Sequence, residues 1–128
     1  MKLKKRQRGF TLIELVIVIA IIAILISIAA MKYSTANLVA EAAAHNSNVK
    51  VLKSAGILYL IDHPDDAGKV ISPESLKPYI EGGKIPKPAK HFKKATTFSV
   101  KASDDGDVVV EPGIIKVSGN SLELDNGN

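Results

Sequence analysis

The chain contains no cysteine, and its three histidines stand far apart in its 128 residues. The absence of cysteine excludes a disulfide and a cysteine nucleophile, and His45, His63 and His91 lack the spacing of metal ligands. A Gly-rich phosphate loop followed by Lys and Ser or Thr is also missing. The length allows one domain with a modest core, which excludes a multidomain enzyme. We therefore expect no enzymatic activity, no bound metal and no other cofactor.

Charged residues are almost missing from one long stretch, because Glu14 is the only one between Arg8 and Lys32. Five of the 17 basic residues fall within the first nine positions, and no acid accompanies them. From Lys32 to Asn128, 12 lysines are matched by 12 acids, so the formal net charge of +4 arises at the N-terminus. The basic composition is therefore no argument for a nucleic-acid partner, which we do not expect to be intrinsic to the chain.

The same stretch is a long hydrophobic run. Of the 22 residues at positions 10–31, only Thr11, Glu14 and Ser27 are not hydrophobic. As a helix this run would span about 33 Å, enough to cross the hydrocarbon core of a bilayer. A cleaved secretory signal peptide is the competing interpretation, but its apolar core is usually only about 7–15 residues long. The basic residues before the run predict a cytoplasmic N-terminus and an external C-terminal domain.

Glu14 is unusual because a carboxylate within an apolar run costs about 2.5–3.5 kcal/mol to insert into a membrane. It can snorkel or become protonated near the helix end, or it can pair with a cation inside the membrane. No Lys or Arg is available between Arg8 and Lys32. Cleavage between Gly9 and Phe10 would create a cation, a new α-amino group four residues before Glu14.

The N-terminus resembles the class III signal of prepilins, the precursors of type IV pilins and of the pseudopilins of type II secretion and DNA-uptake systems. The resemblance rests on a short basic leader ending at Gly9, the sequence Phe10-Thr11-Leu12-Ile13-Glu14-Leu15, and the apolar run that follows. It implies that a membrane prepilin peptidase cuts after Gly9 and N-methylates Phe10. It also implies that Glu14 pairs with the Phe10 amine of a neighbouring subunit during assembly. Helix geometry lets Glu14 reach its own amine too, and the sequence does not choose between the two pairings.

The resemblance implies a structural role, that of a type IV pilus subunit polymerised into a helical fibre through its hydrophobic helix. The expected partners are further copies of the chain, minor pilins, the prepilin peptidase and an assembly platform in the membrane. The precursor is expected to cross the cytoplasmic membrane once with its N-terminus inside. The assembled subunit is then expected in an extracellular pilus or an envelope-spanning pseudopilus. The alternatives are a pseudopilin of a type II secretion or competence system and, from a different class, a monomeric signal-anchored surface protein.

Two features depart from many type IV pilins. Those proteins often carry Pro near the position of Met31, whereas this chain has no Pro before Pro64 and no Gly between Gly9 and Gly56. A continuous helix is therefore expected, and local melting of the helix within the fibre is in doubt. Many pilins of Gram-negative bacteria also close their C-terminal region with a disulfide, which a chain without cysteine cannot form.

We predict an α+β fold in which the C-terminal half of one long helix packs on a small antiparallel sheet of three to four strands. A 4-3 spacing places one stripe of residues on a single helical face, so the helix should run from about Phe10 to about Ile61 and end before Pro64. The stripe consists of Leu38, Ala42, His45, Val49, Leu52, Gly56 and Tyr59. The predicted divisions are a leader over 1–9, a membrane and assembly half of the helix over 10–31, and a soluble domain over 32–128. That domain is divided into helix 32–61, connector 62–90 and sheet 91–128.

Local signals predict the remaining elements. Ser72 and Pro73 are typical of the N-cap and first residue of a short helix, which Pro78 weakens and Gly82-Gly83 ends. Alternation of apolar and polar residues predicts short strands near 98–102, 108–111, 114–117 and 122–124.

The other charged and polar clusters have ordinary explanations. The segments 62–66 and 104–107 are candidate calcium sites, because some secretion pseudopilins bind calcium in C-terminal loops. The second is too short for an EF-hand loop, and Asp and Gly are normal turn residues. A basic patch either binds DNA or another surface or, as we favour, is a solvated face; it consists of Lys84, Lys87, Lys90, Lys93 and Lys94. His45 is expected to be a packing residue and not a ligand.

Overall fold

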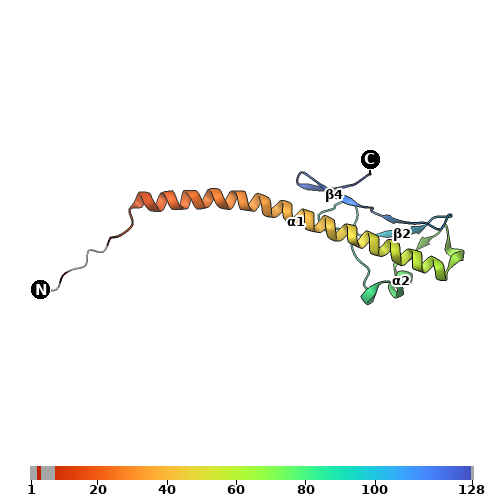
Figure 1. Ribbon diagram of the computed structural model, residues 1–128. Coiled ribbons are helices and arrows are strands. Elements are labelled where there is room, and N and C mark those ends of the chain that lie inside the picture. The colour runs from red at the N-terminus through yellow and green to blue at the C-terminus, as the bar shows by residue number, and fades with distance from the viewer. Residues whose placement is uncertain (1–2, 4–7, 128) are drawn as a thin grey trace. The chain divides into compact units, whose positions relative to one another are not determined.

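A computed structural model describes Leu3 and residues 8–127 of the chain (Figure 1). In chain order the helices, 3-10 helices (η) and strands are α1 (Leu12–Asp62), η1 (Pro64–Asp66), β1 (Val70–Ile71), α2 (Pro73–Leu76), η2 (Lys77–Tyr79), η3 (Glu81–Gly83), β2 (Ser99–Ala102), β3 (Val108–Glu111), β4 (Ile115–Ser118) and β5 (Ser121–Leu124). The α+β class and the long N-terminal helix are confirmed. Positions 1–2 and 4–7 of the predicted leader lie outside the described residues.

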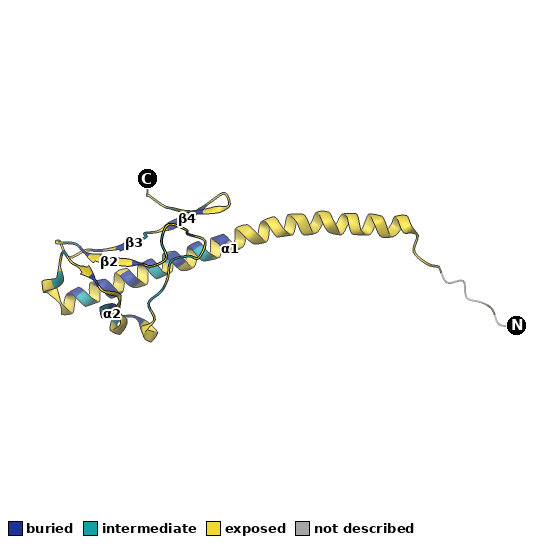
Figure 2. Cartoon of the chain, turned by 180° about the vertical axis from the view of Figure 1, so that it is seen from behind, coloured by how far each residue is buried: buried dark blue, intermediate teal, exposed yellow. Residues whose placement is uncertain are grey.

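Contacts divide the chain into two compact units, the first ending at Ser34 and the second beginning at Thr35. The predicted boundaries of leader, membrane half and soluble domain stay predictions. In the first unit the helical residues are exposed on every side, and an 18-residue window of α1 has a mean hydropathy of 3.2 with no residue buried (Figure 2). By length and composition α1 can cross a membrane, because a helix that is apolar all round requires an apolar environment on every side.

In the second unit, α1 buries one stripe of side chains against the strands (Figure 2). The buried stripe consists of Leu38, Ala42, His45, Val49, Leu52, Ala55, Gly56 and Leu60. It differs from the predicted stripe at the distal end, where Ala55 and Leu60 are buried and Tyr59 is only partly covered. At Gly56 the helix comes very close to β3, since a Cβ placed there would lie 2.7 Å from Val108 Cγ1.

The five strands within the described residues form two separate antiparallel sheets. One has the order β1-β2-β3, with Val100 paired to Val110, and the other is the hairpin β4-β5. In β2 and β3, exposed residues alternate with buried residues that cover the helix. The four strands predicted from alternation are present, and the two-residue β1 is an addition at the start of the connector.

The sheets are separate because Pro112 and Gly113 interrupt the chain between β3 and β4. The backbone groups of Ile115 on the outer edge of β4 instead form hydrogen bonds with a side chain of α1. Asn46 Nδ2 donates to the carbonyl of Ile115 at 2.9 Å, and the Ile115 amide donates to Asn46 Oδ1 at 2.8 Å. A side-chain amide on α1 therefore replaces a neighbouring strand at this point.

The connector between α1 and β2 follows its local signals. Ser72 caps α2 by accepting a hydrogen bond from the Ser75 amide at 3.4 Å, and Pro73 is the first helical residue. After Leu76 the chain tightens into 3-10 turns, as expected from Pro78, and it ends at two glycines with positive φ, 78° at Gly82 and 64° at Gly83.

Candidate processing and assembly site

The helix α1 begins with a reciprocal pair of hydrogen bonds between Thr11 and Glu14. The Thr11 amide donates to Glu14 Oε2 at 3.1 Å, and the Glu14 amide donates to Thr11 Oγ1 at 3.3 Å. This is a capping box, in which two backbone amides that a helix start leaves unpaired are both satisfied by side chains. Thr11 is therefore the N-cap and Glu14 the third residue of the helix.

The cap places Gly9 and Phe10 outside the helix. Helix formation was expected from about Phe10, whereas α1 begins at Leu12, because the N-cap residue itself is not helical. Phe10 is 94% exposed, and a Cβ added to Gly9 would have no neighbour within 4 Å. The Gly9–Phe10 bond thus lies in an exposed, non-helical segment, the kind of backbone that proteases cut most readily.

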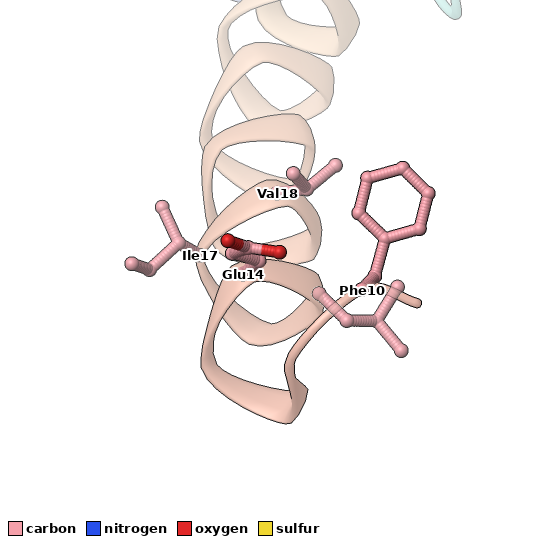
Figure 3. A pocket seen from close by; sticks show the side chains of 5 residues that line it. Phe10, Glu14, Ile17 and Val18 are labelled. Carbon is pink, nitrogen blue, oxygen red and sulfur yellow. The ribbon is translucent and has the colours of Figure 1, made fainter. Parts of the chain in front are cut away.

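The carboxylate of Glu14 is surrounded by apolar side chains. Figure 3 shows it on the surface of the first helical turns between Phe10, Ile17 and Val18, and Leu15 completes the lining of this hollow. Glu14 carries the only ionisable side chain among these lining residues. Thr11 occupies Oε2, and within the described part of the chain no hydrogen bond to Oε1 is present. These residues are exposed in the single chain, so Oε1 is accessible to a cation from another source, which an apolar environment around the helix would favour.

Residues 4–30 match the family described as the prokaryotic N-terminal methylation motif. The chain carries a class III prepilin signal. This is the signal peptide of type IV pilins and pseudopilins, so the resemblance noted in the sequence is confirmed. No curated protein and no solved structure matches the chain.

The prepilin signal brings the three predicted site residues together within six positions of the chain. Gly9 and Phe10 lie just before the cap, and Glu14 lies within it. Cleavage after Gly9, methylation of Phe10 and the pairing of Glu14 with a Phe10 amine stay predictions. Thr11 was not singled out as a site residue, although the Thr-x-x-Glu spacing that marks a capping box is present in the sequence.

His45 is a buried packing residue, as expected. Its Nδ1 accepts a hydrogen bond from the Ala89 amide at 3.0 Å, and its Nε2 lies 2.9 Å from the Gly113 carbonyl. These partners require a proton on Nε2 and none on Nδ1, which is the neutral ring. The ring also packs 5.0 Å from that of Phe98 and 5.9 Å from that of Phe92. Sequence reasoning missed these partners, which lie far along the chain.

In the first acidic cluster, Asp66 is bound by two neighbouring side chains. The Tyr59 hydroxyl donates to Asp66 Oδ2 at 2.6 Å, and Lys69 Nζ donates to Asp66 Oδ1 at 2.9 Å. These bonds, that of Tyr59 above all, lower the pKa of Asp66 and raise the pKa of Tyr59. Within Leu3 and residues 8–127, no group of three or more His, Cys, Asp or Glu side chains lies close enough to hold a metal ion.

The second acidic cluster is tied to the helix in the same way. Asp107 accepts a hydrogen bond from the Val108 amide and pairs with Lys53 at 3.4 Å. The Val108 amide is the larger cause, and together the two contacts lower the pKa of Asp107.

Proposed function

We propose that this chain is the structural subunit of a type IV pilus. The precursor is cut after Gly9, methylated on Phe10 and polymerised through its apolar helix. The observation that carries the proposal is the prepilin signal leading directly into a 51-residue helix whose N-terminal portion is exposed and apolar on all sides. The chain is thus a type IV pilin-like or pseudopilin-type subunit. We assign it a structural role with no catalytic activity and no cofactor.

The helix before Ser34 needs an apolar environment on all sides, first in lipid and then in the fibre. In the bilayer its exposed Ile, Leu and Val side chains contact acyl chains, so helices gain little hydrophobic energy by meeting there. Outside the bilayer the same surface would contact water, at a cost of about 25 cal/mol per Å². Packing against the helices of other copies removes that surface from water, so we expect the subunit to leave the membrane only as part of a fibre.

Processing prepares the helix for this transfer. The five basic residues of the leader hold the N-terminus at the cytoplasmic surface, and removal of the leader releases it. The cut also creates the Phe10 amine, which is the cation available to Glu14 Oε1 of a neighbouring copy. The stability of a charge pair inside an apolar bundle depends strongly on the positions of its two partners, because a shift that separates them leaves two buried, unpaired charges. The pair therefore sets the axial register between subunits.

The proposed location follows from the same charges. The precursor crosses the cytoplasmic membrane once with its N-terminus inside, where the prepilin peptidase and the assembly platform act on it. The soluble unit then lies outside, and assembly with further copies and minor pilins carries it into an extracellular fibre. A monomeric anchored protein would retain its leader and would occur outside fibres.

Mass spectrometry of the mature N-terminus tests the proposal. N-methylated phenylalanine as the first residue, Phe10 of the precursor, is expected in chains purified from sheared surface fibres. An intact leader on the membrane-bound chain, together with no fibres that contain it, would contradict the proposal and support a simple anchored protein.

A pseudopilin of a secretion or DNA-uptake machine is the second candidate. It is favoured by the short part of the chain after Met31, 97 residues, and by the lack of cysteine. Deletion of the gene separates the two candidates. Loss of surface fibres supports the pilus, whereas loss of protein secretion or DNA uptake in a strain without visible fibres supports the pseudopilin.

A further inference from the structure

Lysines and acids are unevenly distributed over the second unit. From Lys32 onward their numbers are equal, yet the segment 82–103 contains six lysines and no acid. We call the first five of these lysines the basic segment; its members are Lys84, Lys87, Lys90, Lys93 and Lys94. All five are exposed, and within the described part of the chain none takes part in an ion pair.

The basic segment is held firmly on the helix although it contains no strand or helix. The Ala89 amide donates to His45, and His91 donates twice to Glu41, from Nδ1 at 2.6 Å and from its backbone amide at 3.2 Å. Phe92 is 2% exposed and packs in the cluster around Leu38 and Ala42. These anchors present the intervening lysines from a defined position, and they occupy Glu41, the nearest acid on the helix.

The acids gather at the other end of the unit. We call this the acidic end; its members are Asp62, Asp65, Asp66, Asp104, Asp105 and Asp107. The turn between β2 and β3 lies at the C-terminal end of α1 in Figure 1, and the Ala102 amide bonds the Lys69 carbonyl there at 2.9 Å. Asp65 and Asp104 are exposed and make no ion pair within the described residues.

The two charged regions are too far apart to neutralise each other within one subunit. His91, within the basic segment, is anchored at Glu41, and Asp107 of the acidic end pairs with Lys53, both on α1. At 1.5 Å per residue, these two anchors are about 18 Å apart along the helix. The Debye length at physiological ionic strength is only about 8 Å. Attraction between the two regions within one subunit is therefore strongly screened.

We infer that the basic segment of one copy docks on the acidic end of a second copy. This rests on the proposed function. An interface between two different surfaces of the same molecule is heterologous, and such interfaces build rings or, where the rotation does not close, open helical fibres. A nucleic acid would match the basic segment but would be repelled by the acidic end. A second copy offers each of the two regions a surface of the opposite charge.

Charge reversal in the full-length chain, expressed with its own peptidase and assembly platform, tests the inference. The Lys93→Glu/Lys94→Glu variant should yield at least about tenfold fewer sheared fibres, because like charges across an interface are strongly unfavourable. Adding Asp65→Lys and Asp104→Lys to the same chain restores opposite charges and should restore the fibres. The control is Lys50→Glu, which reverses an exposed lysine of α1 outside both the basic segment and the acidic end and should assemble normally.

The outcomes separate this inference from the proposed function. Absence of fibres from the unmodified chain contradicts the proposed function itself. Normal fibres from Lys93→Glu/Lys94→Glu overturn the docking of the basic segment, and so does a loss that the two added lysines fail to repair. Normal fibres that no longer retain added duplex DNA would assign these lysines to nucleic acid and would likewise overturn docking on a second copy. A loss that is repaired in the combined variant also shows that the reversed chain still folds.

Discussion

Thr11 and Glu14 donate a backbone amide to each other's side chain at the start of α1, so one carboxylate both caps the helix and faces an apolar hollow. The two roles use different oxygens, because the cap occupies Oε2. Glu14 thus has a structural function in the isolated subunit before any neighbour is present. A suitable substitution of Glu14 can therefore remove the proposed assembly pair while keeping the helix cap.

Glu14→Gln should keep the cap and lose the assembly pair. Glutamine at the third helical position can still accept from the Thr11 amide, but it carries no charge for an amine. We expect normal leader removal by N-terminal mass spectrometry and few or no fibres. Glu14→Ala should behave alike in assembly. Thr11→Ala is the matched control, since it weakens the cap by about 1 kcal/mol while keeping the charge. Normal fibres from Glu14→Gln would refute the register role.

Asn46→Leu should loosen the β4-β5 hairpin. The substitution leaves the Ile115 amide and carbonyl without partners, at a cost of about 1–3 kcal/mol for each buried group. We expect faster amide hydrogen exchange in 114–124 and a lower urea midpoint for the full chain in detergent. Asn48→Leu provides the control, because Asn48 lies on the same helix at similar burial with no hydrogen bond between its side chain and the hairpin. Equal exchange in both variants would show that Asn46 does not hold the hairpin.

Gly56→Ala should destabilise the second unit despite the better helix propensity of alanine. The added methyl would lie 2.7 Å from Val108 Cγ1 and 3.2 Å from Val100 Cγ1. Overpacking costs about 1–3 kcal/mol, against a propensity gain of about 1 kcal/mol. Adding Val108→Ala makes room and should recover part of the loss in a double-mutant cycle. Ser54→Ala, on the exposed face, serves as the control. An increased urea midpoint for Gly56→Ala alone would contradict the close contact.

Acid should weaken the packing around the end of α1. The pKa values of Asp66 and Asp107 are lowered by their hydrogen bonds, for Asp66 mainly from Tyr59 and for Asp107 mainly from the Val108 amide. A lowered pKa in the folded state contributes stability that is complete above the unfolded value of about 3.9 and is lost as the pH falls through the folded value. The urea midpoint should therefore fall at acid pH.

Asp66→Asn should flatten the acid limb of that curve, whereas Asp65→Asn, next to it and without a bonded partner, should leave it unchanged. Tyr59 acts in the opposite direction. Its raised pKa contributes stability below the ordinary tyrosine value, and that stability is lost as the pH rises through the folded value. Tyr59→Phe should remove this alkaline contribution and reduce the acid one. Curves of the same shape for Asp66→Asn and the unmodified chain would argue against the pairing.

The prepilin signal and the long helix could be predicted from the sequence alone, because both depend on residues that are close together in the chain. Gly9, Phe10 and Glu14 lie within one short motif. The hydrophobic run at positions 10–31 can be recognised without knowing which other segment contacts it. The start of α2 is indicated by its own residues, Ser72 and Pro73. The four strands longer than two residues were likewise visible as alternation. The helix starts at Leu12 and not at Phe10, because Thr11 and Glu14 form a capping box. The Thr-x-x-Glu spacing that marks this box is already present in the sequence.

Only the tertiary structure decided how the soluble unit is held together. Asn46 pairs with Ile115 across 69 positions, Ala89 bonds His45 across 44, and His91 bonds Glu41 across 50. Such pairs leave no periodic pattern, since an Asn or His on a helix looks the same whether it faces water or a distant backbone group. The division into two sheets and the separation of the basic segment from the acidic end could not be predicted from the sequence either. They depend on which distant segments the hydrophobic stripe of α1 brings against it, and that choice is made by packing.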